Sequence, residues 1–198
     1  MGISGLSRST LAADEAFADA APIARPSFED TYRTFFPFVF RNAGRLGVHR
    51  ASIDDVVQEV FLVVHRRLPD YDGRAPIKSW VYGIVAHVVR THRRTQRRKD
   101  PASSDVDAID LVAEASAEPH RLAEQREAAR FLFRILDLLD DDKREVLILS
   151  ELEQMTVPEV AHAIGANVNT VYSRVKAAKK AFIEIHARES ARAARRRR

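Results

Sequence analysis

Apolar residues recur at helical spacing in two parts of the chain, residues 28–99 and residues 122–187. In the first part, one stripe at this spacing consists of Ile53, Val57, Val60, Val64 and Leu68. Residues spaced three and four apart share one side of a helix, and an apolar stripe of this kind faces a core. No segment alternates apolar and polar residues convincingly, as a half-buried strand would. The pattern predicts an all-α fold made of two small helical domains.

Three further segments lack this periodicity. Residues 1–27 are rich in Ala, Ser, Asp and Pro, and residues 100–121 are rich in Asp, Ser, Ala, Glu and Pro. Such compositions favour a flexible leader and a flexible acidic linker. Residues 188–198, which end in a run of arginines, are predicted to form an unstructured basic tail. The predicted domains, an N-terminal helical bundle at 28–99 and a C-terminal domain at 122–187, are therefore joined by an acidic tether.

The polar face of the helix predicted at 53–68 contains one apolar residue. Leu62 stands among Asp55, Gln58 and Glu59, opposite the apolar stripe. An apolar side chain ringed by polar groups is typical of a protein interface with a polar rim. Single exposed leucines are also common on ordinary surfaces. The helical pattern alone leaves both interpretations open.

The next predicted helix, residues 79–98, follows a loop at 70–78 and has a cationic face. The side opposite its valines carries Trp80, His87, Arg90, Thr91 and Arg94. An aromatic ring beside guanidinium groups suits a surface that stacks bases and neutralises phosphates. A solvated arginine-rich face, with the tryptophan at the edge of the core, would produce the same pattern. The residues by themselves favour neither interpretation.

Residues 156–180 have the layout of a helix-turn-helix. Thr156 is a predicted N-cap, Pro158 suits the first helical turn, and Glu159 stands where a capping box requires it. Gly165 can adopt the left-handed conformation that ends a short helix. A second helix then begins near Val168. In a helix-turn-helix, this second helix enters the major groove of DNA.

The outer face of this second helix carries the groups that DNA recognition needs. It consists of Asn169, Thr170, Ser173, Arg174, Lys176, Ala177 and Lys180. Amide and hydroxyl groups can read base edges, a small apolar side chain can meet a thymine methyl, and lysines can hold phosphates. The C-terminal domain is therefore predicted to bind DNA.

Composition narrows the classes of protein to which the chain can belong. Lys and Arg number 32 against 28 Asp and Glu, and the charges lie in blocks, of which the basic ones favour polyanions. The chain has no cysteine, which excludes disulfides and Cys-ligated metal sites and fits the cytoplasm. No apolar run approaches the ~18–20 residues of a membrane span, and no secretory signal is expected.

No motif for catalysis stands out. The sequence contains no HExxH, no Walker loop and no Ser–His–Asp grouping, and its histidines are scattered. The acidic run 140–142 favours a helix start over a metal site, because carboxylates stabilise helix N-termini. We therefore expect no enzymatic activity, no metal, no cofactor and no small-molecule substrate.

Several motifs together resemble those of bacterial RNA polymerase sigma factors. Asp55–Phe61 resembles the polymerase-binding helix of that family, and Tyr71–Arg74 with Ser79–Tyr82 resembles its melting loop and aromatic motif. Arg144–Leu147 and Asn169–Arg174 resemble helices of its C-terminal promoter-binding domain. The motifs occur in the family's order and spacing. The middle domain of larger members has no room here, which favours the extracytoplasmic-function (ECF) group of the sigma-70 family.

The resemblance implies a sigma factor that binds core RNA polymerase and directs promoter recognition, DNA melting and transcription initiation. It implies polymerase contacts by Asp55, Gln58, Glu59 and Leu62. It implies contacts to the minus-ten region by Asp72, Arg74, Lys78, Ser79, Trp80, His87, Arg90, Thr91 and Arg94. The outer face of the helix that begins near Val168 would then read the minus-thirty-five element. An anti-sigma factor is a further implied partner.

Two residues depart from the family pattern. His87 stands where relatives often have Asn, and Thr91 where they often have Asp, so the minus-ten preference is expected to differ. The main alternative is a stand-alone helix-turn-helix regulator that does not bind polymerase. That alternative explains the C-terminal domain but leaves the helix around Leu62 and the loop before Trp80 without a role.

Overall fold

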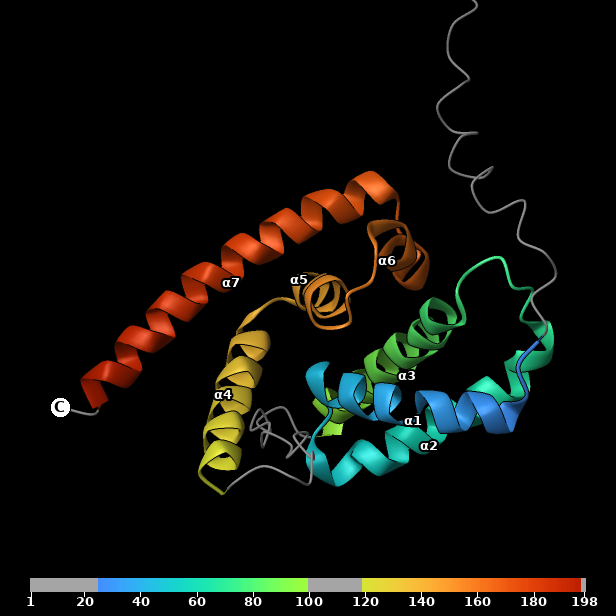
Figure 1. The fold of residues 1–198 in the computed structure, drawn as a ribbon, viewed down its shortest axis with the longest axis horizontal. Helices are drawn as coiled ribbons and strands as arrows, with labels where there is room; N and C mark the ends of the chain where they lie inside the picture. Colours follow the sequence, from blue (N-terminus) through green and yellow to red (C-terminus); the bar gives the residue numbers. More distant parts are fainter. Residues whose placement is uncertain (1–24, 100–118, 197–198) are drawn as a thin grey trace, which may run out of the picture.

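The computed structural model describes residues 25–99 and 119–196 of the 198-residue chain. The leader predicted at 1–27 and the linker predicted at 100–121 therefore lie almost entirely outside the described residues. Within the two described ranges, all regular secondary structure is helical (Figure 1). The all-α prediction is confirmed.

The N-terminal module is a bundle of three helices. They are α1 (Phe28–Arg45), α2 (Ile53–Arg67) and α3 (Ile77–Lys99), with 3₁₀ turns at Arg50–Ser52 and Leu68–Asp70. Figure 1 shows α1 and α2 running side by side, with α3 packed against both.

Local signals explain where the N-terminal helices lie and how they pack. The Ser27 side chain accepts a hydrogen bond from the backbone N–H of Asp30, so it satisfies one of the free donors at the start of α1. The whole predicted stripe is buried, from Ile53 on α2 to Leu68 in the 3₁₀ turn that follows, and Val60 and Val64 are completely inaccessible. Burial of such side chains is the main stabilising contribution to the bundle.

The C-terminal module contains four helices and one irregular turn. They are α4 (Pro119–Leu138), α5 (Asp141–Leu147), the π-helical turn η4 (Ile148–Leu152), α6 (Val157–Ile164) and α7 (Val168–Arg196). Helix α4 thus begins inside the predicted linker. The long helix α7 contacts α4, α5 and α6, and it lies on the side of the molecule remote from α1 and α2 (Figure 1).

The prediction of an unstructured tail at 188–198 is wrong as far as Arg196, because α7 continues to that residue. Alanine and arginine, which dominate this segment, are among the best helix formers. In addition, Arg192 forms an ion pair with Glu189 one turn earlier, at 3.0 Å. Helical propensity therefore outweighs the repulsion between the arginines. The run of positive charges alone was not a sufficient reason to predict an unstructured tail.

The helix-turn-helix forms through the capping contacts that its sequence predicts. The Glu159 carboxylate accepts hydrogen bonds from the backbone N–H of Thr156 at 2.7 Å and from its hydroxyl at 2.8 Å, as in a capping box. Gly165 ends α6 in the left-handed conformation, with φ of 64°. At the start of α5, Asp140 caps the backbone N–H of Lys143, so the acidic run 140–142 begins a helix as predicted.

Replacing Gly165 with alanine is expected to destabilise the C-terminal module by about 1 kcal/mol. A Cβ at this position would meet no atom within 4 Å, so the cost comes from the positive φ alone and not from a clash. Urea unfolding followed by circular dichroism measures this loss of stability. Ala166→Gly, which exchanges the same two residue types at the next position, is the control. An unchanged midpoint for Gly165→Ala would show that the turn relaxes at no cost.

The two modules pack against each other along one seam. We use this term for the contact of α3 and the C-terminal half of α1 with α5, η4 and α6. Buried apolar side chains continue across it, from Val85 on α3 to Val160 and Ala163 on α6. The tether therefore joins two modules that share one apolar core, an arrangement that no local pattern in the sequence predicts.

Candidate polymerase and promoter interfaces

The polar face of α2 is open to solvent. Asp55, Gln58, Glu59 and Leu62 are all exposed, and Leu62 has more than half of its surface accessible, at 54%. They occupy successive turns of one helix whose other side is held by the core stripe. The structure therefore brings the four residues predicted to bind polymerase together on one face.

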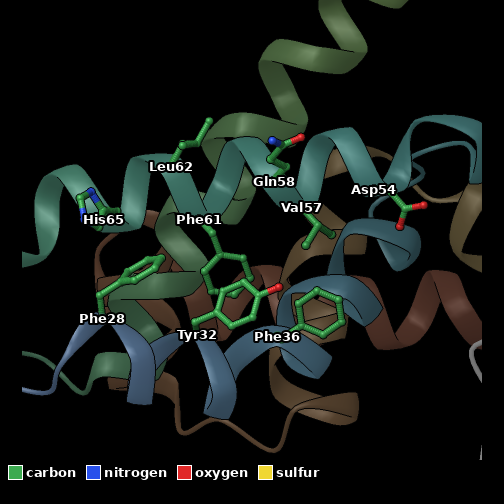
Figure 2. A pocket seen from close by; sticks show the side chains of 9 residues that line it. All are labelled: Phe28, Tyr32, Phe36, Asp54, Val57, Gln58, Phe61, Leu62 and His65. Carbon is green, nitrogen blue, oxygen red and sulfur yellow. The ribbon is translucent and has the colours of Figure 1, made fainter.

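A hollow of about 460 Å³ lies next to this face, between α1 and α2 (Figure 2). It is lined by Phe28, Tyr32, Phe36, Asp54, Val57, Gln58, Phe61, Leu62 and His65. The floor is aromatic, because the ring of Phe61 lies 4.6 Å from that of Tyr32 and stacks on that of Phe36 at 6.3 Å. The hollow combines exposed aromatic and aliphatic surface with a polar edge, which is the composition of a protein-binding site.

Sequence reasoning missed the contribution of α1 to this hollow. Phe28, Tyr32 and Phe36 follow one another at intervals of four, which is the spacing of one helical face. Tyr32 and Phe36 remain 43% and 38% exposed, so this face is not simply core. The interval was the signal that could have identified it.

The loop before α3 is anchored by an aromatic pair. Tyr71 is buried, its ring lies 5.4 Å from that of Trp80, and its hydroxyl donates a hydrogen bond to the Ala75 carbonyl at 2.5 Å. By contrast, Asp72 and Arg74 are exposed and paired with each other, with the Asp72 carboxylate accepting from the Arg74 backbone N–H at 3.1 Å. The loop thus presents one carboxylate and one guanidinium to solvent on a fixed base.

The minus-ten residues predicted on α3 differ in their accessibility. His87, Arg90, Thr91 and Arg94 are exposed, whereas Lys78 and Trp80 are half-buried. Ser79 is completely buried, and its hydroxyl has no hydrogen-bond partner. Ser79 is therefore not accessible to DNA in this arrangement of the modules, and its contact with the minus-ten region stays a prediction. The physical reason is the seam, since Ser79 lines a small hollow between α3 and α6.

Acidic side chains of the C-terminal module reach the cationic face of α3. Arg90 lies 3.8 Å from the Glu145 carboxylate, and Arg93 lies 2.6 Å from that of Asp141. Burial raises the pKa of Glu145, although Arg90 acts in the opposite direction. Part of the surface predicted to bind the minus-ten region is thus paired with carboxylates of the same chain.

The outer face of α7 is accessible along its first three turns. Asn169, Thr170, Ser173, Lys176, Ala177 and Lys180 are exposed, and Val171 and Ala178 on the opposite side are buried. Arg174 is half-buried and paired with Asp142 at 3.1 Å. Tyr172 was not predicted as a site residue but is 60% exposed. Six of the seven predicted minus-thirty-five residues therefore share one open helix face, and Arg174 lies partly buried at its flank.

No grouping of His, Asp and Glu that could hold a metal ion occurs among the residues that the structure describes. Over the same residues, no helix is both long and apolar enough to cross a membrane.

Comparison with known proteins shows which family this chain belongs to. Residues 31–99 match the family described as Sigma-70 region 2, and residues 132–182 match the family described as Sigma-70, region 4. The ECF RNA polymerase sigma-E factor of Escherichia coli (strain K12) is 30% identical over 142 residues, which cover 68% of this chain and 74% of that relative. The chain belongs to the ECF sigma factors of the sigma-70 family.

Other relatives of this sigma factor agree. The RNA polymerase sigma factor NccH of Alcaligenes xylosoxydans xylosoxydans is 27% identical over 139 residues, which cover 69% of this chain and 74% of NccH. The solved structure of CnrH with the cytosolic domain of CnrY is similar with a TM-score of 0.60 and 25% identity, covering 87% of this chain and 96% of that one.

The fold also matches RpoE in its complex with the anti-sigma factor NepR from Bartonella quintana, with a TM-score of 0.64 and 19% identity over 80% of this chain and 95% of that one. The region 2 match spans most of α1 to α3, and the region 4 match spans the end of α4 to the middle of α7. This sigma factor directs transcription initiation.

Proposed function

We propose that this sigma factor holds core RNA polymerase through the α2 face and the aromatic hollow beside it. The observation that carries this assignment is Leu62, an apolar side chain that is 54% exposed at the edge of an apolar hollow. Asp54, Asp55 and Glu59 supply negative charge around it. Such a surface fits a helical partner with apolar side chains flanked by basic ones.

Promoter DNA would be contacted by two other faces. The loop at Asp72–Arg74 and the cationic face of α3 would hold the minus-ten region, with Trp80 available to stack on a base and Arg90 and Arg94 available to phosphates. The outer face of α7 would read the minus-thirty-five element in the major groove. The separation of these groups on different helices supports two distinct DNA contacts.

The protein would act by binding alone, in the cytoplasm, and catalyse no reaction. Opening about ten base pairs costs on the order of 14 kcal/mol, at ~1.4 kcal/mol per stacking step. Stacking one or two flipped bases on an aromatic ring returns only ~1–3 kcal/mol each. The difference must come from polymerase, so the proposal requires the holoenzyme and not the free sigma factor for DNA melting.

An anti-sigma factor is a further proposed partner. CnrH, which is 25% identical and similar over most of both chains, was solved in complex with the cytosolic domain of CnrY. An exposed aromatic hollow such as the one beside Leu62 would be shielded in such a complex. We therefore propose that a protein of this kind competes with polymerase for the α2 face.

Run-off transcription with core polymerase on a set of genomic promoter fragments tests the proposed function. We expect this sigma factor to redirect the polymerase to discrete start sites and the free polymerase to give none of them. The alternative of a stand-alone helix-turn-helix regulator is not favoured by the region 2 match. It would return if the protein bound duplex sites but directed no transcript.

Two substitutions on α7 should separate base reading from phosphate binding. Asn169→Ala is expected to lose about 1–3 kcal/mol of discrimination at one base pair of the minus-thirty-five element. Lys180→Ala should weaken binding to all sequences alike and lower the salt dependence by about one ion. Competition transcription on templates with single base changes, repeated at several salt concentrations, measures both. Equal losses on all templates for both variants would contradict the assignment.

A further inference from the structure

Helix α7 extends well beyond the part of it that the family comparison covers. The region 4 match ends at residue 182, whereas the helix continues to Arg196. The middle of α7 is held by α4, because the ring of His186 lies 5.3 Å from that of Phe131, edge to face. Residues 187–196, which we call the arm, continue the same helix without a break (Figure 1). The direction of the arm is therefore fixed by the folded module.

The arm carries arginines on the same side of α7 as residues that are proposed to read DNA. Five turns of an α-helix take 18 residues, at about 3.6 residues per turn. Arg188 therefore stands at the same angle around the helix as Thr170, and Arg195 stands at the same angle as Ala177. At a rise of about 1.5 Å per residue, each arginine lies about 27 Å further along the helix axis. The reading face of α7 thus continues into a cationic face.

These two arginines are open to a partner. Arg188 and Arg195 are both exposed, and neither forms an ion pair within the part of the chain that the structure describes. Glu184 stands between them and the reading face, but its carboxylate lies 4.0 Å from the Lys180 nitrogen, which reduces its repulsion of an anion. Exposed guanidinium groups bind phosphate strongly through charge-assisted hydrogen bonds. The face therefore fits a partner with phosphates spaced along a backbone.

We propose that the arm binds the phosphate backbone of duplex DNA upstream of the minus-thirty-five element. This inference rests on the proposed reading of that element by the outer face of α7. In Figure 1 the arm leads away from α3 and α6. Since the module that contains α3 is the one proposed to hold the minus-ten region, which lies downstream, the arm points upstream. One strand of DNA carries a phosphate every ~3.4 Å, so an arm of about 27 Å reaches at most about eight base pairs beyond the bases that are read.

The arm supplies affinity without a preference for sequence. Arginines that neutralise phosphates release counterions from DNA, so each contact strengthens binding and makes it more dependent on salt. A straight helix diverges from a straight duplex, and the contact therefore requires the upstream DNA to curve toward α7. Proteins compensate the cost of such a curve with the additional contacts that it permits. The arm is thus a second, sequence-independent hold on the promoter beside the minus-thirty-five element.

Binding of the holoenzyme to two labelled promoter fragments, followed by fluorescence anisotropy, tests this inference. The short fragment ends at the upstream edge of the minus-thirty-five element, and the long one extends about 15 base pairs further, beyond the reach of the arm. The variant combines Arg188→Gln with Arg195→Gln, since glutamine removes the charge and keeps a high helical propensity. We expect the variant to bind the long fragment about tenfold more weakly at about 0.1 M salt, with a salt dependence lower by about two ions. On the short fragment, the variant and the unchanged chain should bind equally.

The matched control combines Arg126→Gln with Arg130→Gln, which removes the same charge from exposed positions of α4 in the same module. It should bind both fragments as the unchanged chain does, and circular dichroism checks that both double variants keep their helices. An equal loss on the two fragments would overturn the proposal and assign the arm to polymerase. No loss on either fragment, or an equal loss in the control, would also overturn it. If the sigma activity itself fails, the unchanged holoenzyme gives no transcript from either fragment, so the two failures are distinguishable.

Discussion

Leu62→Asp is expected to weaken the binding of this sigma factor to core RNA polymerase by about 100-fold, or ~2.7 kcal/mol. Leu62 is the most exposed apolar residue of α2 and borders the aromatic hollow. An interface residue at the centre of a polar rim contributes most when it is desolvated in a pocket of the partner. An aspartate there would bury a charge and would add to the carboxylates already on this face.

Fluorescence anisotropy of the labelled sigma factor, titrated with core polymerase, measures this loss. Leu138→Asp is the matched control, since Leu138 is 51% exposed, lies at the end of α4 and receives the same substitution. The melting temperature of both variants should stay close to that of the unchanged chain, because neither side chain is buried. Equal affinities for the two variants would remove Leu62 from the polymerase interface.

Elements whose signals are local were predictable from the sequence. The α2 stripe, the capping box at Thr156–Glu159 and the left-handed Gly165 each depend on residues within one or two turns, and the structure confirms all three. The exposed face of α7 was predictable for the same reason, since helical spacing alone separates Asn169 from Val171. The aromatic face of α1 has an equally local signal, the interval of four between Phe28, Tyr32 and Phe36.

The seam was not predictable in this way. Glu153 contacts residues of α1 and α3 that are 75 to 112 positions away along the chain. Ser79 looked like a polar surface residue and is buried because α6 covers it, and Gly83 had no turn to explain it. Such contacts depend on how two finished modules fit together, and helical periodicity does not describe that fit. The burial of predicted site residues on α3 could therefore not be anticipated where the modules meet.

Arg144 is a buried charge at the junction of α4 and α5, and it donates hydrogen bonds to several backbone carbonyls. Its side chain is 4% exposed, and its guanidinium donates to the carbonyls of Leu136 at 2.7 Å and Asp137 at 3.0 Å, with longer contacts of 3.4 Å to Leu139 and Leu46. The carbonyls of Leu136 and Asp137 belong to the last turn of α4, and that of Leu139 follows directly after the helix. The end of a helix leaves carbonyls without intrahelical partners, and of these three the Leu136 carbonyl also accepts from the backbone N–H of Leu139 at 3.2 Å. The fourth belongs to the N-terminal module.

Arg144→Ala is therefore expected to destabilise the protein by about 3–5 kcal/mol, since the buried carbonyls lose the guanidinium as a donor and the Asp137 carboxylate loses the cation 3.6 Å away. Against a total of about 5–15 kcal/mol for a typical domain, this is a large share of the stability. Arg144→Lys should recover only part of it, because one ammonium cannot span the carbonyls that the planar guanidinium reaches.

Thermal unfolding should show the loss as a fall of about 10 °C or more for Arg144→Ala. Lys143→Ala is the control on the same helix, where the ion pair with Asp140 is partly exposed and contributes at most about 1 kcal/mol. The order expected for the melting temperature is unchanged chain, Lys143→Ala, Arg144→Lys and then Arg144→Ala. If Arg144→Lys had the same melting temperature as the unchanged chain, a single positive charge would be sufficient for the stability of this junction. The several hydrogen bonds of the guanidinium at the end of α4 would then contribute nothing measurable.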